Sequence, residues 1–415
     1  MRSLAAKQAS VKRGTIIFGI DLAKGDNWVQ IMNTEAVNLG RMTFTHDAAG
    51  YQQLLQRITV LKEQHRAPEV IVAMEPTSYF WKLLAAFLER QQQRYVLVNP
   101  YTVKKHREGD QLDISKSDPR DAFFVADLTR TGKFTDTQLL HGPYAELREL
   151  CLLERQLKKN EQRERNYISN LVGQLFPEFQ QAFKDVTGQT ARALLRRHAV
   201  PAVLTRVPFA ALIRAVRQDF TGTRLMVSKI RHAQELAATS IGLRDVTLAQ
   251  QHALRIHLTC WEASSAQRKE VQSEITTLFM TLPEAPYMLS VPRLGVITAA
   301  RILAEIGDPS RFRRSSQLIK LAGTQPAPNT SGQRTRSRTP MSHQGRPELR
   351  SALYYAAMRL IQGCPAFRAA YERLLERPHH PLLRMEALGA MMNKLLRILW
   401  ALMQHQTMYD PACVH

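Results

Sequence analysis

The sequence is poor in cysteine and in acidic residues, and it contains no long apolar run. Its four cysteines, Cys151, Cys260, Cys364 and Cys413, lie far apart and form no C-x-x-C pair. This spacing argues against a disulfide scaffold and a zinc site, and it is consistent with a reducing cytoplasm. No stretch approaches the roughly 18 apolar residues of a membrane span, and no apolar segment follows the basic N-terminal residues. We therefore expect neither a membrane protein nor a secretion signal.

The shortage of acidic residues leaves a large positive charge. The 415 residues include 57 Lys and Arg against 36 Asp and Glu, a formal net charge of +21. Such an excess indicates a polyanionic partner, and nucleic acid is the usual one. The apolar fraction of 44% is normal for a globular protein, and the length suggests two or three domains. Charge alone does not distinguish a protein that binds nucleic acid from one that cuts it.

The first third of the chain alternates between strand and helix patterns. We predict strands at 15–20, 28–32, 42–45, 69–74 and 95–98, and helices at 47–64, at 79–92 and from 118 onward. Asp47 is the predicted N-cap of the first helix, and Asn99-Pro100 is read as the end of the last strand. This order predicts an α/β domain with a mixed sheet flanked by helices.

The middle of the chain reads as helical. A charged helix is predicted from about 144 to 176, and its apolar residues at a spacing of three to four are Leu147, Leu150, Leu153, Leu157, Ile168, Leu171 and Leu175. Such a stripe suits half of a coiled coil, an antiparallel helical hairpin, or a helix packed on its own domain. From 179 to 280 the pattern stays mostly helical, with breaks near Gly188, Pro201, Pro208 and Gly222, and no motif stands out.

The last third is expected to be mostly α-helical, with helices after the turn at 291–295, from 347 to 362 and from 386 to 403. Gly295 begins the first of them, where free N–H groups and the hydroxyl of Thr298 could hold a phosphate; a plain tight turn is the alternative. Residues 311–350 contain one acid and nine bases, which could contact phosphates or simply be solvated. The bases are Arg311, Arg313, Arg314, Lys320, Arg334, Arg336, Arg338, Arg346 and Arg350.

Four carboxylates are candidates for catalysis. Asp21 and Glu75 end two predicted strands, where ligand sites form in an open sheet. Asp118 and Asp121 are three residues apart at a helix start, so both can lie on one face. Converging carboxylates suit Mg²⁺. A pair of such ions can stabilise both the attacking and the leaving oxygen when a phosphodiester is cleaved. The alternative is that each acid is a helix cap or a surface charge.

Several segments resemble the DEDD transposases of the insertion-sequence 110 family. GIDLAK at 19–24, AMEPTS at 73–78 and KSDPRDA at 116–122 resemble the family's DEDD tetrad. SVPRLGVITAARILAEIGD at 290–308, AGTQPAPNTSG at 322–332 and GRPELR at 345–350 follow in the family's order. The resemblance implies a RuvC-like catalytic domain of the RNase H fold at 14–140, a helical coiled-coil region at 141–284 and a C-terminal transposase domain at 285–410.

The resemblance also implies a mechanism. Asp21, Glu75, Asp118 and Asp121 would hold Mg²⁺, with Mn²⁺ as the alternative ion, and Ser331 would be the nucleophile toward double-stranded DNA. A structured noncoding RNA would act as guide, in a dimer or tetramer with a composite site, and the location would be the bacterial cytoplasm at the nucleoid. Thr330 is a poorer candidate nucleophile, and a loop hydroxyl beside a turn glycine is the plain alternative. Two other functions stay open: a RuvC-like nuclease without a covalent intermediate, and a non-catalytic nucleic-acid-binding protein.

Overall fold

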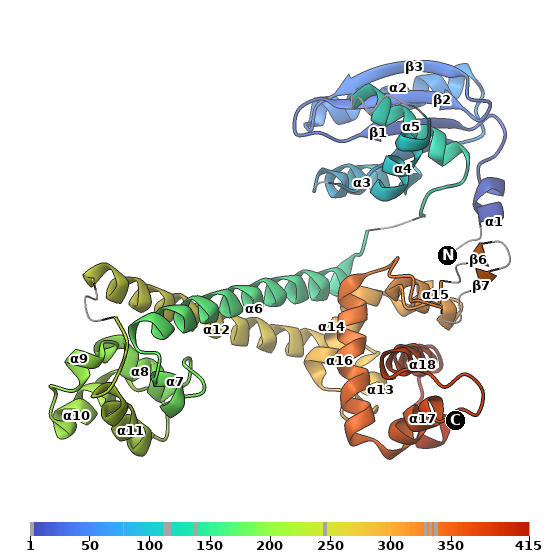
Figure 1. The fold of residues 1–415 in the computed structure, drawn as a ribbon. Helices are drawn as coiled ribbons and strands as arrows, with labels where there is room; N and C mark the ends of the chain where they lie inside the picture. The colour runs from blue at the N-terminus through green and yellow to red at the C-terminus, as the bar shows by residue number, and fades with distance from the viewer. Residues whose placement is uncertain are drawn as a thin grey trace. The chain divides into compact units, whose positions relative to one another are not determined.

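The structure, a computed structural model, describes residues 4–77, 79–110, 118–136, 139–243, 247–327, 330–331, 334–335 and 339–414. The chain divides into two compact units, Met1–Leu140 and His141–His415, which are described separately (Figure 1). Among the described residues, no helix combines the length and the apolar character that crossing a membrane requires.

The first unit is built on a mixed five-stranded sheet. Its strands lie in the order β3-β2-β1-β4-β5, with β1, β2 and β3 antiparallel and with β4 parallel to both β1 and β5. The strands are β1 (Ile16–Asp21), β2 (Asn27–Asn33), β3 (Asn38–Phe44), β4 (Val70–Met74) and β5 (Tyr95–Leu97). All five predicted strands are present, and β3 begins four residues earlier than predicted.

Helices cover both faces of this sheet. One face packs against α2 (Ala48–Gln64) and α3 (Phe80–Arg90), and the other packs against α4 (Pro100–Asp110) and α5 (Asp118–Arg130). Strands covered on both faces are expected to be apolar throughout, and every residue of β4 is buried. The predicted cap is confirmed, because the carboxylate of Asp47 accepts a hydrogen bond of 2.7 Å from the backbone N–H of Gly50.

Helix α4 is absent from the sequence prediction, as is the short α1 (Leu4–Ala9). The prediction took Asn99-Pro100 only as a strand end, yet Pro100 is the first residue of α4. The side chain of Asn99 accepts from the backbone N–H of Tyr101 at 2.9 Å. Proline is favoured at a first helical position because the N–H that it lacks has no partner there anyway. The same dipeptide therefore ends β5 and begins α4.

The second unit contains an antiparallel helical hairpin of α6 (Gly142–Leu175) and α12 (Leu248–Met280), which run side by side in Figure 1. Gln272 donates to Glu154 at 2.9 Å, whereas His257 lies 2.7 Å from Glu164, so positions along the two helices run in opposite directions. The hairpin is one of the predicted alternatives. The inward place predicted for Leu153 is wrong, since Leu153 is 47% exposed and the fully buried Glu154 pairs with Arg268 and Arg301 instead.

Five short helices form a small module between the two long ones, which we call the tip module (residues 179–243). They are α7 (Phe179–Ala182), α8 (Gln189–His198), α9 (Pro201–Leu204), α10 (Phe209–Asp219) and α11 (Val227–Ala237). The predicted breaks are confirmed: Gly188 and Pro208 are N-caps, Pro201 begins α9, and Gly222 lies between α10 and α11. The module has its own apolar core, to which the adjoining ends of α6 and α12 contribute.

The rest of the second unit is mostly helical around one apolar core. Its elements are α13 (Ala285–Leu289), α14 (Val296–Ile306), η1 (Pro309–Arg311), α15 (Ser315–Ala322), β6 (Thr330–Ser331), β7 (Arg334–Thr335), α16 (Pro347–Gly363), α17 (Pro365–Leu375), α18 (Arg384–His405) and η2 (Pro411–Val414). The three predicted helices correspond to α14, α16 and α18. Helix α17 was missed because Pro365 was read as a stop, whereas it is the first residue of α17.

Candidate active site

Two of the candidate carboxylates are placed by strand register. In the parallel pair β1 and β4, Ile20 lies opposite Met74. Asp21 follows Ile20 and Glu75 follows Met74, so both acids lie at the carboxyl ends of adjacent strands. Residues that follow parallel strands at this edge of a sheet project into the same crevice. Register alone therefore brings the first two acids together.

The third carboxylate reaches this edge because α5 packs closely on β1. Gly19 makes the approach possible: a Cβ atom there would lie 2.4 Å from the carbonyl oxygen of Ala122 and 2.4 Å from the backbone nitrogen of Ala126. Asp121 immediately precedes Ala122 on α5 and is only 6% exposed. The glycine of the GIDLAK segment thus sets the distance between the strand that ends in Asp21 and the helix that carries Asp121.

We expect Gly19→Ala to destabilise the first unit by about 3 kcal/mol, since the added Cβ would meet backbone atoms that cannot rotate away. The added Cβ should also displace α5, and Asp121 with it, from the strand end that carries Asp21. Gly25→Ala is the matched control, as a Cβ there meets nothing within 4 Å. Thermal unfolding of both variants tests the packing argument, which fails if Gly19→Ala melts like the control.

The three acids line one cavity of about 300 Å³. Its walls come from the ends of β1 and β4 and from α4 and α5, and the lining residues are Asp21, Leu22, Ala23, Glu75, Thr77, Pro100, Val103, Lys104, Arg107 and Asp121. The fourth candidate, Asp118, is the first residue of α5, and its side chain lies outside the described residues. Three of the four carboxylates singled out in the sequence therefore face a common space.

Arg107 is the residue of this cavity that the sequence analysis missed. Its guanidinium donates to both carboxylate oxygens of Asp121, at 2.9 and 3.2 Å, and the two side chains are 22% and 8% exposed. Both bonds come from the single nitrogen Nη1, and a hydrogen bond between two charged groups is stronger than one between neutral groups. Lys104 lies one helical turn before it on α4. Reading Asn99-Pro100 as a helix start would have placed both bases on one helix beside the acids.

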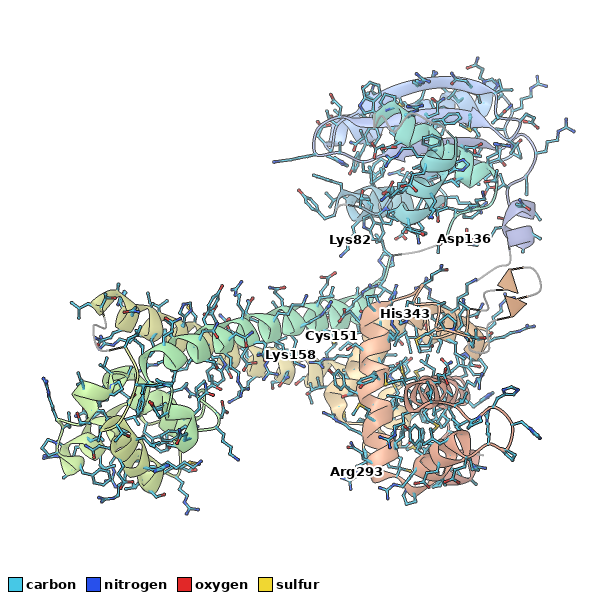
Figure 2. The ribbon with its side chains drawn as sticks, in the orientation of Figure 1. Lys82, Asp136, Cys151, Lys158, Arg293 and His343 are labelled. Atoms are coloured by element: carbon cyan, nitrogen blue, oxygen red, sulfur yellow. The ribbon has the colours of Figure 1, made fainter. Side chains whose placement is uncertain are left out.

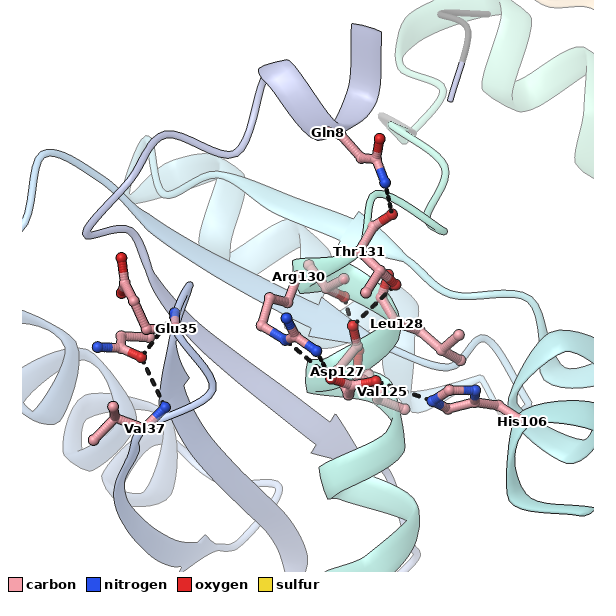
Figure 3. Close-up of polar contacts among 11 residues, drawn as sticks. Gln8, Glu35, Val37, His106, Val125, Asp127, Leu128, Arg130 and Thr131 are labelled. Atoms are coloured by element: carbon pink, nitrogen blue, oxygen red, sulfur yellow. Dashed lines mark hydrogen bonds and ion pairs between the residues drawn. The ribbon is translucent and has the colours of Figure 1, made fainter. Parts of the chain in front are cut away.

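A second contact holds α4 against α5 (Figure 3). Asp127 of α5 lies 3.0 Å from Nε2 of His106 on α4, and it accepts a hydrogen bond of 3.0 Å from Nε of Arg130 on its own helix. Because His106 and Arg107 are neighbours, both contacts act on the same turn of α4. The position of Arg107 in the cavity is therefore supported by the packing of two helices.

The donor set of the cavity suits a hard divalent cation. Carboxylate oxygens are the ligands that Mg²⁺ prefers, and a cavity of this size leaves room for the waters that Mg²⁺ retains. Among the described residues, however, no three His, Cys, Asp or Glu side chains are arranged to hold one ion. In the described arrangement the positive charge beside Asp121 is that of Arg107.

The candidate nucleophile Ser331 belongs to a two-strand hairpin of the second unit. Ser331 pairs with Arg334, and the side chains of both lie outside the described residues, as do Arg336 and Arg338 altogether. Backbone hydrogen bonds close the segment beneath: Ala327 donates to Pro340 at 2.9 Å, and His343 donates to Gly323 at 3.0 Å. Ser331 thus belongs to a segment, residues 327–340, whose two ends are joined by a backbone hydrogen bond.

The six bases of residues 311–350 whose side chains the structure describes fall into two groups. Arg311, Arg313, Arg314 and Lys320 are exposed. Arg346 donates to the backbone carbonyl of Glu305, and Arg350 donates to that of Ala322 at 2.8 Å. Burial, with Arg148 nearby, lowers the pKa of Arg346 to about 10. The two inner arginines therefore support the fold here, and the four outer ones are open to solvent.

The predicted helix start at Gly295 is confirmed as the N-cap of α14. Gly295 is exposed and no atom lies within 4 Å of a Cβ built there, whereas Thr298 is half-buried. The first turn of α14 therefore has the access that a phosphate contact would need.

Two family models match the chain. A DEDD-type IS110 transposase model matches residues 18–177, and a model described as transposase, IS116/IS110/IS902 family, matches residues 285–372. Together these ranges cover more than half of the sequence. The first range contains the cavity acids, and the second contains the Ser331 hairpin.

Two similar proteins each cover most of the chain, and a third covers about a third of it. A protein of Streptomyces coelicolor described as a transposase for the mini-circle IS117 is 27% identical, over 87% of this chain and 88% of its own. The 44.8 kDa protein of insertion element IS116 of Streptomyces clavuligerus is 26% identical, over 97% of this chain and 98% of its own. A pilin gene-inverting protein of Moraxella lacunata is 29% identical, over 36% of this chain and 46% of its own.

These matches define the class: the chain is a transposase, an enzyme that cuts and rejoins DNA. It belongs to the IS116/IS110/IS902 family.

Proposed function

We propose that the first unit is an RNase H-like catalytic domain whose DEDD acids, with Ser331, exchange DNA strands at the ends of an insertion sequence. The observation that carries the proposal is the convergence of Asp21, Glu75 and Asp121 on one cavity. The sheet order, with three antiparallel strands followed by two parallel ones, is consistent with that fold. Asp118 begins the helix that bears Asp121 and is the proposed fourth acid.

The proposed reaction is transesterification at phosphorus. Ser331 Oγ forms a bond to the DNA phosphate, the bond from phosphorus to a deoxyribose oxygen breaks, and the serine proton leaves the hydroxyl as the released deoxyribose oxygen gains one. A deoxyribose hydroxyl of another strand then attacks the phosphoserine and restores the enzyme, so the number of phosphodiester bonds is conserved. Mg²⁺ or Mn²⁺, held by the four acids, would supply stabilisation of the charge that develops on the phosphate oxygens.

Binding of DNA is assigned to the second unit in this proposal. The exposed Arg311, Arg313, Arg314 and Lys320 would contact backbone phosphates, together with Arg334, Arg336 and Arg338 near the serine. Gly295 and Thr298 would hold one further phosphate at the start of α14. A structured noncoding RNA as guide and a dimer or tetramer as the active form complete the proposal, in line with the resemblance found in the sequence.

We expect Mg²⁺ to stabilise the wild-type chain against unfolding, by about 2.7 kcal/mol at 100 times its Kd. Asp21→Asn should lose this gain, because it removes one charged ligand from the cavity. Asp26→Asn, an exposed acid five residues further on, is the matched control and should keep it. Thermal unfolding with Mg²⁺ and with EDTA measures the effect. Equal stabilisation of Asp21→Asn and wild type would refute a metal site at these acids.

A further inference from the structure

The tip module carries much more positive charge than the hairpin that bears it. Residues 179–243 include ten Lys and Arg against three Asp and Glu, a net charge of +7. Helices α6 and α12 together have a similar length, with nine Lys and Arg against eight Asp and Glu, a net charge of +1. The excess of the tip module is therefore local. It is not the average of a basic protein.

Most of this charge is not neutralised within the fold. Arg192 and Arg196 pair with Glu262, and Arg197 pairs with Asp219. Seven other bases are exposed, and no ion pair involves them among the described residues: Lys184, Arg206, Arg214, Arg217, Arg224, Lys229 and Arg231. Uncompensated like charges on a small module repel one another and destabilise its compact state. A bound polyanion would relieve that repulsion.

Two of these bases, Arg206 and Arg231, lie on segments that are bonded to each other. The guanidinium of Arg231 on α11 lies over the ring of Phe209, 4.0 Å from its centroid. One turn further on, the amide of Gln234 donates to the carbonyls of Leu204 and Val207, at 3.1 and 2.8 Å. These bonds fix α11 against the turn that carries Arg206. Arg206 and Arg231 thus present their charges from adjoining, well-supported backbone.

Lys229 lies two residues before Arg231, on another side of α11, next to the end of α7. Its ammonium group lies 6.0 Å from the ring centroid of Phe183, the neighbour of Lys184. Helix α11 is therefore bordered by bases on two sides, and its buried residues Ile230, Ala233 and Ala237 keep it anchored in the apolar core of the module. The charged groups belong to one rigid support.

We propose that the tip module is a second nucleic-acid-binding surface, which holds the sugar–phosphate backbone through Arg206, Lys229 and Arg231. The inference goes beyond the proposed catalysis, because these residues belong to a different unit from the cavity acids. Contacts to phosphates position a nucleic acid without reading its bases, and they weaken as salt rises. DNA and RNA share this backbone chemistry, so the experiment must separate them.

The test uses the full-length chain. One variant combines Arg206→Gln, Lys229→Gln and Arg231→Gln, and the matched control combines Lys158→Gln, Lys159→Gln and Arg163→Gln on the exposed side of α6, where Figure 2 labels Lys158. Both lose three positive charges. Binding of a DNA duplex and of an RNA hairpin is measured separately by fluorescence anisotropy over a range of salt concentrations.

We expect the tip variant to bind at least one polymer about tenfold more weakly or worse. The slope of log K against log salt concentration should also become shallower, by the amount that corresponds to about two to three phosphate contacts. The polymer that loses affinity is the ligand of the module. The control should bind like wild type. The proposal is overturned if the tip variant binds both polymers like wild type, or if the control loses as much.

Loss of folding is separated from loss of charge by a third variant, which combines Arg206→Lys and Arg231→Lys. It keeps all three charges and should keep most of the affinity. If this variant retains wild-type helicity by circular dichroism and still fails to bind, charge is not what the module contributes and the proposal falls.

Discussion

Replacing Ser331 by alanine is expected to abolish any covalent protein–DNA adduct and to reduce recombination by at least about a thousandfold. The substitution removes the hydroxyl proposed to form the intermediate, and comparable substitutions in covalent enzymes cost several orders of magnitude. Ser331 belongs to the two-residue strand β6, and the substitution removes a single oxygen atom, so the fold should survive the change. Denaturing gel electrophoresis of the protein with labelled DNA detects the adduct.

Thr330→Ala is the matched control, because Thr330 carries the neighbouring hydroxyl of the same strand β6. It should leave the adduct in place. An adduct that persists in Ser331→Ala and vanishes in Thr330→Ala would assign the nucleophile to Thr330. DNA cleavage that continues in both variants without any adduct would identify a RuvC-like nuclease that uses water, and the proposed transesterification would be rejected.

Asp121→Asn is expected to lower recombination by a similar factor while DNA binding persists. The substitution keeps the size of the side chain and removes the charge proposed to hold Mg²⁺. It also weakens the ion pair with Arg107, and breaking a buried pair costs about 3 kcal/mol. A drop in activity alone would therefore not separate a metal ligand from a structural acid.

Arg107→Gln makes that separation. It breaks the same ion pair but leaves the carboxylate of Asp121 in the cavity. If Asp121 binds metal, stabilisation by Mg²⁺ should be lost in Asp121→Asn and kept in Arg107→Gln, where one competing cation is gone. Equal Mg²⁺ stabilisation in the two variants would make Asp121 a structural residue. Asp118→Ala should behave like Asp121→Asn, and undiminished recombination in either would refute the proposed tetrad.

Much of the first unit could be predicted because local sequence and tertiary packing agree there. Apolar runs that end in Asp21 and Glu75 are buried strands, and Asp47 caps its helix as its position predicts. The parallel pairing of β1 with β4 then brings the ends of these two strands together, so two of the site acids could be paired in advance.

Other features were hidden because one residue type serves two purposes. Proline ends strands and helices, yet it also begins helices, so Asn99-Pro100 concealed α4 and Pro365 concealed α17. The stripe of leucines on α6 predicted Leu153 on the inner face. A fully buried Glu154, stabilised by arginines from distant parts of the chain, takes part in the packing instead.

The sequence by itself determined the strands, the long helix α6, the positions of the acids and the excess of positive charge, because these follow from neighbouring residues. Only the tertiary structure decided which groups meet: Gly19 beneath α5, Arg107 on Asp121, and Arg231 on Phe209. Such contacts join residues that are far apart in the chain. They depend on how helices pack, which no local pattern of side chains specifies.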